Sequence, residues 1–381
     1  MFIDTGWSSL PKFGEELCGD NVEVAKTADA VVAVLADGLG SGVKANILSK
    51  MTAKIIVTML EKGASLEEVV DTIGNTLPIC QKRLLAYSTF TIIHAKENGE
   101  VYIIEFDNPS VFFIHGGQIS TVSFREIEVL GKKIKETRFQ ASPGDILVAV
   151  SDGVVHAGIG GVLNLGWQWE NVAEYLQRMA KPVVNAKSMS RVLLTVSEEL
   201  YAGRPGDDAT VMVLQIRNPR TVTVAVGPPR AKDDDRVLME KLQAETGKKV
   251  VCGGTTGTIV ARYLQKEIMV DINKLDPEVP PTGNLPGIDL VTEGIITLNK
   301  TLEYLRVAHF PEQVPAKDNG AVDLAKILLE GDEINFIVGR AINPAHQNPD
   351  LPLSLGMKIK AVDEISNVLS SLGKQVTVQY L

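Results

Sequence analysis

The stretch VVAVLADGLGSG, residues 31–42, decides how the first part of this chain is expected to fold. Its apolar, β-branched beginning predicts a buried strand over residues 31–36. The strand ends at a carboxylate, Asp37, which is followed by three alternating glycines, and a helical pattern begins at Val43. We therefore expect Asp37 at the end of a strand, on a turn open enough for the backbone to approach a ligand. A hard cation would suit such a turn because it takes oxygen ligands, but an acidic turn without a ligand fits the same residues.

Length and charge limit the classes of protein to which the chain can belong. With 381 residues it is long enough for two domains, each with its own core. Apolar residues make up 45% and charged residues 22%, which is typical of a globular protein. The net charge of −9 argues against general binding to nucleic acid or to an anionic membrane surface, and no cluster of lysine and arginine overrides it.

The three cysteines and the apolar runs indicate the expected location. Cys18, Cys80 and Cys252 lie far apart, so they predict neither a disulfide framework nor a cysteine zinc site. The first ten residues lack the basic start and apolar core of a signal peptide. No apolar run approaches the length of about 18 residues that a membrane span needs. We therefore expect a cytoplasmic protein without a membrane segment.

Hairpins and pairs of helices alternate in the first half of the chain. Asn98-Gly99 is a strong hairpin signal between strands expected over 88–95 and 100–107. Ser65 followed by Glu68 is a capping box at the start of a helix. This order predicts an antiparallel α+β domain over residues 1–217. The other elements expected in it are helices over 43–62, 65–84, 168–180 and 184–200, strands over 22–25, 110–114, 118–122, 131–140, 146–150 and 210–216, and a loop over 154–166.

Four aspartates of this half share a local pattern. Asp20, Asp37, Asp152 and Asp207 each stand next to a glycine, and the last three adjoin an expected buried strand. Acids at the ends of neighbouring strands can converge, and a cation would then offset their repulsion. Because histidine and cysteine are absent from these motifs, Mg²⁺ or Mn²⁺ is favoured over zinc. Each aspartate taken alone is also compatible with an ordinary turn.

The combination of these motifs resembles a known family. Asp37–Ala45 (DGLGSGVKA), Ser151–Gly153 (SDG) and Gly206–Thr210 (GDDAT) stand in the order seen in metal-dependent protein phosphatases of the PPM, or protein phosphatase 2C-like, type. Gly19–Asn21 (GDN) stands where that family has its first acid. The nearest branch resembles the bacterial phosphatases typified by sporulation stage II protein E. The resemblance covers about residues 10–216.

The resemblance implies a central antiparallel β-sandwich flanked by helical pairs. It also implies that the protein removes phosphate from phosphoserine or phosphothreonine of a phosphoprotein substrate, through a water that bridges two Mn²⁺ or Mg²⁺ ions. Asp37 would bridge the two ions, and Asp208 is not expected to be a ligand. The implied metal set consists of Asp20, Asp37, the backbone carbonyl of Gly38, Asp152 and Asp207, with Asp20 and Asp37 as the catalytic pair.

Three features depart from the family's pattern. Leu39 stands where the eukaryotic branch has a histidine proposed as general acid. No arginine precedes Asp20 to hold the substrate phosphate, and Lys12 is a weak substitute. Asp107–Ser110 replaces the usual small residues and histidine. These departures leave open an alternative function, a phosphatase-like regulatory or binding protein with little or no turnover.

The pattern resets after a short junction at residues 218–220. Strands and helices then alternate, which predicts a smaller α/β domain with a largely parallel sheet over residues 221–381. We recognise no family for it, and a sensor, ligand-binding or docking domain is expected. The elements expected are strands over 221–226, 249–252, 287–291, 333–338 and 375–380, and helices over 233–246, 253–265, 321–329 and 363–372.

One loop of this second half has a chemical pattern. Gly253-Gly254-Thr255-Thr256 leads from a strand into a helix, so it could present backbone amides and hydroxyls to a phosphate or carboxylate. It matches neither the dinucleotide-binding nor the P-loop pattern. A tight structural turn fits the residues equally well. A small anionic ligand or a protein partner is therefore the expected occupant, if the loop binds one.

Overall fold

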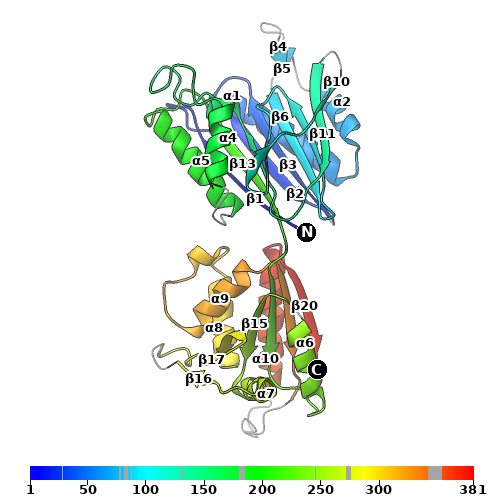
Figure 1. The fold of residues 1–381 in the computed structure, drawn as a ribbon, viewed down its shortest axis with the longest axis vertical. Helices are drawn as coiled ribbons and strands as arrows, with labels where there is room; N and C mark the ends of the chain where they lie inside the picture. Colours follow the sequence, from blue (N-terminus) through cyan, green and yellow to red (C-terminus); the bar gives the residue numbers. More distant parts are fainter. Residues whose placement is uncertain are drawn as a thin grey trace. The chain divides into compact units, whose positions relative to one another are not determined.

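The computed structural model divides into two compact units, Met1–Asn218 and Pro219–Leu381. Figure 1 shows the elements of each unit. The structure describes all residues except 28, 77–78, 81–84, 87, 130–131, 180–184, 245, 272–275 and 342–353.

The first unit contains two antiparallel sheets and five helices within the described residues. One sheet has the strand order β1-β13-β12-β8-β9 and the other has β10-β11-β7-β6-β3-β2. A short pair, β4-β5, lies outside both sheets. The elements are β1 (Phe2–Leu10), β2 (Asp20–Lys26), β3 (Ala30–Gly38), α1 (Gly42–Glu61), α2 (Leu66–Thr76), β4 (Ile79–Cys80), β5 (Leu85–Ala86), β6 (Ser88–Lys96), β7 (Glu100–Phe106), β8 (Phe112–His115), β9 (Gln118–Ser120), β10 (Arg125–Val129), β11 (Lys132–Gln140), β12 (Ile146–Val150), α3 (Asp152–Val155), α4 (Trp169–Met179), α5 (Ala186–Leu200) and β13 (Ala209–Arg217).

Strand β3 is buried on both faces, which explains its continuous apolar sequence. Alternate side chains along a strand point to opposite faces. Val31, Ala33 and Leu35 contribute to the core between the two sheets. The intervening Val32 and Val34 contribute to the core beneath helices α1 and α2. Helices α4 and α5 pack on the outer face of the other sheet, so the unit is a β-sandwich covered by helices on both sides (Figure 1).

Several expected elements of this unit differ from the observed ones. The helix expected over 65–84 ends at Thr76, and Ile79–Cys80 belongs to a strand. Proline at position 78 accounts for this, because it disfavours a helical conformation in the residue before it. Strands β1 and β10 were not expected, and the expected loop over 154–166 begins inside helix α3. The expected positions 131, 180 and 184 lie outside the described residues.

The second unit contains one mixed sheet with the strand order β16-β17-β18-β15-β14-β19-β20. Its centre is parallel from β18 to β20, whereas β16 and β17 pair in antiparallel fashion. The elements are β14 (Thr221–Val226), α6 (Asp234–Ala244), β15 (Lys248–Cys252), α7 (Gly254–Leu264), β16 (Met269–Val270), β17 (Gly283–Leu285), β18 (Ile288–Thr292), α8 (Ile295–Leu305), the short 3₁₀ helix η1 (Pro311–Gln313), α9 (Gly320–Glu330), β19 (Glu333–Val338), α10 (Ser354–Ser371) and β20 (Gln375–Tyr380).

Both faces of the second sheet are covered by helices. Val224 of β14 contributes to the core with α8, α9 and α10. Its neighbour Ala225 contributes to the opposite core, with α6 and α7. Helix α8 was not expected from the sequence, and α10 begins nine residues before the helix expected over 363–372. A strand that is apolar on both faces is typical of such a sheet.

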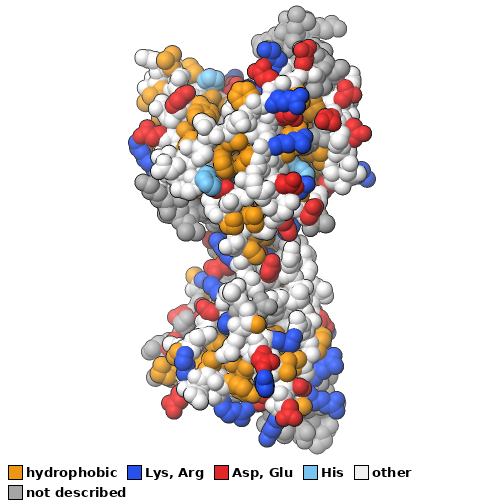
Figure 2. All heavy atoms as spheres, turned by 45° about the vertical axis from the view of Figure 1, so that its right-hand side comes forward, with side chains coloured by type: hydrophobic (Ala, Val, Ile, Leu, Met, Phe, Trp, Pro, Cys, Tyr) orange, Lys and Arg blue, Asp and Glu red, His pale blue; other side chains and the backbone are white. Residues whose placement is uncertain are grey.

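Charge and hydropathy of the folded chain are unexceptional. Acidic and basic side chains are interspersed on the face of each unit that Figure 2 shows. Among the described helices, none combines the length and the apolar character that crossing a bilayer requires.

Candidate active site, a cavity lined by carboxylates

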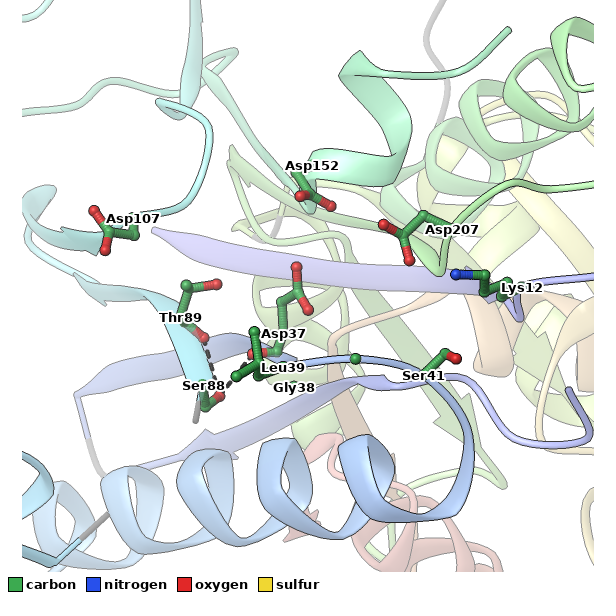
Figure 3. A pocket seen from close by; sticks show the side chains of 11 residues that line it. Lys12, Asp37, Gly38, Leu39, Ser41, Ser88, Thr89, Asp107, Asp152 and Asp207 are labelled. Atoms are coloured by element: carbon green, nitrogen blue, oxygen red, sulfur yellow. Dashed lines mark hydrogen bonds between the residues drawn. The ribbon is translucent and has the colours of Figure 1, made fainter. Parts of the chain in front are cut away.

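A cavity of about 450 Å³ in the first unit brings together aspartates from three separate parts of the chain. Asp37 is the second-last residue of β3, Asp152 begins α3 just after β12, and Asp207 stands just before β13. All three side chains line the cavity, and Figure 3 shows their carboxylates directed toward a common space. The structure therefore brings together three of the four acids that the sequence singles out, together with Gly38.

Close packing requires a glycine after Asp37 and after Asp152. A side chain on Gly38 would overlap the backbone carbonyl of Ala45 in helix α1. A side chain on Gly153 would overlap the backbone carbonyl of Asp208. The Asp-Gly pairs thus allow neighbouring backbone segments to approach each acid closely. Ser88 also fixes the end of β3, because its hydroxyl donates a hydrogen bond to the Asp37 carbonyl at 2.9 Å (Figure 3).

Asp20 lies next to this cavity but does not line it. It is paired with Asp37 across the antiparallel strands β2 and β3. Its side chain is only 3% exposed, and neither carboxylate oxygen has a hydrogen-bond partner among the described residues. A buried carboxylate without partners is costly, so these two oxygens call for a proton or a cation.

The acids perturb one another strongly. Burial raises the pKa of Asp37, and the neighbouring charges of Asp20, Asp152 and Asp207 raise it further. Burial also raises the pKa of Asp20, and the charge of Asp208 adds to the increase. The pKa of Asp152 is raised by burial and then by the charge of Asp207. Such a cluster holds its full negative charge only when positive charge is supplied.

The donor set fits a hard divalent cation. It consists of carboxylates, backbone carbonyls and hydroxyls, which are the ligands that Mg²⁺ and Mn²⁺ prefer. The orphaned oxygens of Asp20 and the mutual repulsion at Asp37 support the same assignment. Among the described residues, however, no three His, Cys, Asp or Glu side chains already stand at the spacing of a metal site. The residues present therefore fit the chemistry of a cation, but they do not form a finished coordination shell.

Sequence reasoning missed several residues of the cavity wall. Ser88, Thr89 and Asp107 line it, and Thr89 donates a hydrogen bond to Asn108 at 2.6 Å. Asp107 has a positive φ of 53°, a conformation that aspartate tolerates better than most residues. Asp107 follows β7 directly. The only signal for it in the sequence was that residues 107–110 depart from the pattern of the family.

Lys12 and Asp208 connect the cavity to the segment before β2. Lys12 lines the cavity on the side of Asp207 (Figure 3). Its backbone N–H donates to Asp208 Oδ1 at 3.0 Å. Asp208 is buried, and its Oδ2 has no hydrogen-bond partner among the described residues. Asp208 is thus a second buried acid behind the cavity wall, beside Asp20.

The glycine–threonine loop of the second unit lies at another cavity. Gly253, Gly254, Thr255 and Thr256 join the end of β15 to the first turn of α7, and all four line that cavity.

Comparison with known proteins gives a family match for the first unit. The family model described as stage II sporulation protein E (SpoIIE) matches residues 27–217, which is half of the chain. Among curated proteins, stage II sporulation protein E of Bacillus subtilis (strain 168) is 25% identical over 230 residues. The match covers 56% of this chain but only 26% of that protein, so this chain corresponds to about a quarter of its relative.

Solved structures give similar but more distant matches. A structure of the PP2C phosphatase domain and a fragment of the regulatory domain of SpoIIE from Bacillus subtilis is 21% identical, with a TM-score of 0.49. That match covers 57% of this chain and 62% of the other. The RsbU and RsbW domains of a Mycobacterium tuberculosis protein are 17% identical, with a TM-score of 0.45. There the match covers 64% of this chain and 67% of the other.

Proposed function

Because the chain belongs to the stage II sporulation protein E (SpoIIE) family, we propose that it is a metal-dependent phosphatase acting on phosphoserine or phosphothreonine of a protein substrate. The observation that carries the proposal is the convergence of Asp37, Asp152 and Asp207 on one cavity. Three acids from distant parts of the chain are costly to gather in one place unless they have a function. A pocket that combines perturbed acids with an open space is a typical site for catalysis.

The residues of the cavity have distinct roles in this proposal. Asp20, Asp37, Asp152, Asp207 and the backbone carbonyl of Gly38 would hold two divalent cations, Mn²⁺ or Mg²⁺. When bound, these ions supply the positive charge that activates water and offsets charge on a phosphoryl group. Lys12 would contribute further positive charge toward the substrate phosphate. Since Leu39 offers no proton, the leaving serine or threonine oxygen would take its proton from solvent water.

The proposal is tested by hydrolysis of a phosphoserine peptide with Mn²⁺, Mg²⁺ or EDTA. We expect turnover with at least one of the two metals and none in EDTA. Asp37→Ala should lower turnover at least about 100-fold, because it removes a carboxylate that would hold the metal ions. Asp71→Asn, which changes an exposed acid on α2, is the matched control and should keep full activity. Circular dichroism of each variant checks that the fold is retained.

A second candidate function is a regulatory platform that binds a phosphoprotein without turning it over. Leu39 in the cavity wall favours it, since it replaces a group that could donate a proton. The same experiment separates the two functions. Absence of turnover with both metals, together with phosphopeptide binding that survives Asp37→Ala, would support the platform.

The remaining expectations from the sequence stay predictions. We propose that the second unit is a regulatory domain that senses a ligand or docks a protein partner, and that neither unit binds nucleic acid or a membrane. The cytoplasmic location is likewise a prediction.

A further inference from the structure

The second unit has its own cavity, of about 270 Å³, at the carboxyl ends of its parallel strands. Residues that follow three neighbouring strands, β14, β15 and β18, line it together with the first part of α10.

The order of the strands places this cavity at a characteristic position. The chain enters the sheet at β14 and moves outward through β15 to β18. It then returns to the other side of β14 to form β19 and β20. The direction of winding therefore reverses between β14 and β19. In open α/β sheets, ligands bind outside the carboxyl ends of the strands at such a switch point.

Two helix N-termini meet at the cavity, and neither is capped by a side chain. Gly253 precedes α7 and Gly294 precedes α8, and neither glycine can supply a capping oxygen. A Cβ on Gly294 would lie 3.8 Å from the Cα of Gly253, so the two termini are neighbours. The first N–H groups of a helix have no partner within the helix and carry partial positive charge. Together they favour an anionic group in the cavity.

Thr256 gives an independent indication that a ligand completes the site. It lines the cavity, yet its side chain is fully buried, and its Oγ1 has no hydrogen-bond partner among the described residues. A buried hydroxyl without a partner is destabilising. A ligand oxygen in the cavity would supply the missing partner.

Lys358 brings a positive charge to the same place. Its ammonium donates a hydrogen bond to the Gly339 carbonyl, just beyond β19, at 2.6 Å. It also lies over Gly227, just beyond β14, where a side chain on the glycine would overlap it. The ammonium is thus held at the switch point. Because an ammonium has three donors, it can bind an anion as well.

The rest of the lining suits a larger molecule than a free anion. Glu293 lines the cavity. Its carboxylate accepts a hydrogen bond from the N–H of Gly294 at 3.1 Å, and it has further capacity to accept hydrogen bonds from hydroxyl groups. Ile296 and Met357 also line it while remaining 53% and 45% exposed, so they offer an apolar surface at its edge. The positive end of the cavity suits a phosphate, and the carboxylate suits the hydroxyl groups of a ribose. The apolar edge suits a base.

We propose that the second unit binds a nucleoside monophosphate in this cavity. The phosphate lies against the first turn of α7, where Thr256 and Lys358 donate hydrogen bonds to it. The ribose hydroxyls donate to Glu293, and the base packs on Ile296 and Met357. This inference goes beyond the proposed phosphatase function and does not depend on it.

The test is calorimetric titration of the full chain with AMP, GMP, CMP and UMP in EDTA. EDTA keeps divalent cations from carrying phosphate to the carboxylate cavity of the first unit. We expect at least one nucleotide to bind with one-to-one stoichiometry. Thr256→Val and Lys358→Met should each weaken that binding about tenfold or more, because each removes a donor to a charged phosphate.

Thr297→Val is the matched control. Thr297 is another fully buried threonine in the first turn of a helix whose hydroxyl has no partner among the described residues, but it does not line the cavity. Its replacement should leave nucleotide affinity unchanged. Thr256→Val should not lower the thermal stability of the nucleotide-free protein, because it removes an unsatisfied polar group.

Two results would overturn the proposal. One is that none of the four nucleotides binds, or that inorganic phosphate binds as tightly as every nucleotide. The other is that Thr256→Val and Lys358→Met bind the nucleotide as tightly as the unaltered chain does.

Discussion

At the scale of single residues, the notable feature is a set of acids that the protein buries without compensating charge. Asp20 and Asp37 face each other across two strands. Asp208 lies close enough for its charge to raise the pKa of Asp20. The pKa of the Cys18 thiol is also raised, by its burial and then by the charge of Asp20. The fold therefore maintains a region of negative potential behind the cavity, where a bound cation would be strongly stabilised.

This arrangement predicts how stability depends on pH. The pKa values of Asp20 and Asp37 are raised in the folded protein above about 4 in the unfolded chain. The folded protein therefore binds protons more tightly, and its stability decreases as pH rises from about 4 through the raised values. In EDTA, we expect Asp37→Asn to melt at a higher temperature than the unaltered chain, by at least about 5 °C at pH 8.

The comparison at pH 5 and the addition of metal complete this experiment. The difference between the two proteins should shrink at pH 5, because there Asp37 is protonated in the folded protein and carries no charge. Mn²⁺ should raise the melting temperature of the unaltered chain and have little effect on Asp37→Asn. The prediction would be contradicted if, at pH 8 in EDTA, Asp37→Asn melted at a lower temperature than the unaltered chain.

At the scale of elements, the contact between β3 and α1 positions the candidate active site. Gly38 ends β3, and the backbone of Ala45 in α1 packs directly over it. The Asn46 side chain of α1 donates to the Cys18 carbonyl at 2.7 Å, which ties the helix to the segment before β2. Because α1 holds both β2 and β3, its position affects Asp20 and Asp37 together.

Gly38→Ala should therefore damage both stability and the site. The added methyl group would overlap the Ala45 carbonyl, so α1 must shift or the strand end must bend. We expect a loss of about 2 kcal/mol in the free energy of unfolding, measured by chemical denaturation. Any phosphatase activity should fall as well.

Gly161→Ala is the control for this substitution. Gly161 lies in an exposed loop of the same unit, and a Cβ there would meet only the Gly158 carbonyl at an ordinary 3.7 Å. Its replacement should change stability by less than about 0.5 kcal/mol. Equal effects of the two substitutions would show that the close approach at Gly38 has no special importance.

At the scale of the whole molecule, the chain has two sets of hydrophobic cores that share no residues. Three of them lie in the first unit and two in the second. The division falls between Asn218 and Pro219. Each unit therefore buries enough apolar surface to fold alone.

We expect residues 1–218 and 219–381, expressed separately, each to unfold in one cooperative thermal transition. Circular dichroism checks this, with the full chain as the reference. If the proposals are right, the first fragment retains phosphopeptide hydrolysis and the second retains nucleotide binding. A fragment without a cooperative transition would show that its core depends on the other unit.

The sequence by itself determined most of the elements and three of the four acids that line the cavity. The apolar run before Asp37 predicts the buried strand, and the capping box at Ser65 and Glu68 is present, with both of its hydrogen bonds. These features are local, because strand pattern, turn chemistry and capping depend on residues a few positions apart. For the same reason the parallel centre of the second sheet could be predicted from alternating strands and helices.

Only the tertiary structure decided how the local pieces meet. It paired Asp20 with Asp37 but left Asp20 behind the cavity wall, and it added Asp107 to that wall. It also brought Lys358 and the uncapped start of α8 to the glycine–threonine loop, although they are distant in sequence. Such neighbours depend on strand order and helix packing over the whole sheet. Local patterns predict only the pairing of strands joined by a tight turn, such as β6 and β7 around Asn98-Gly99.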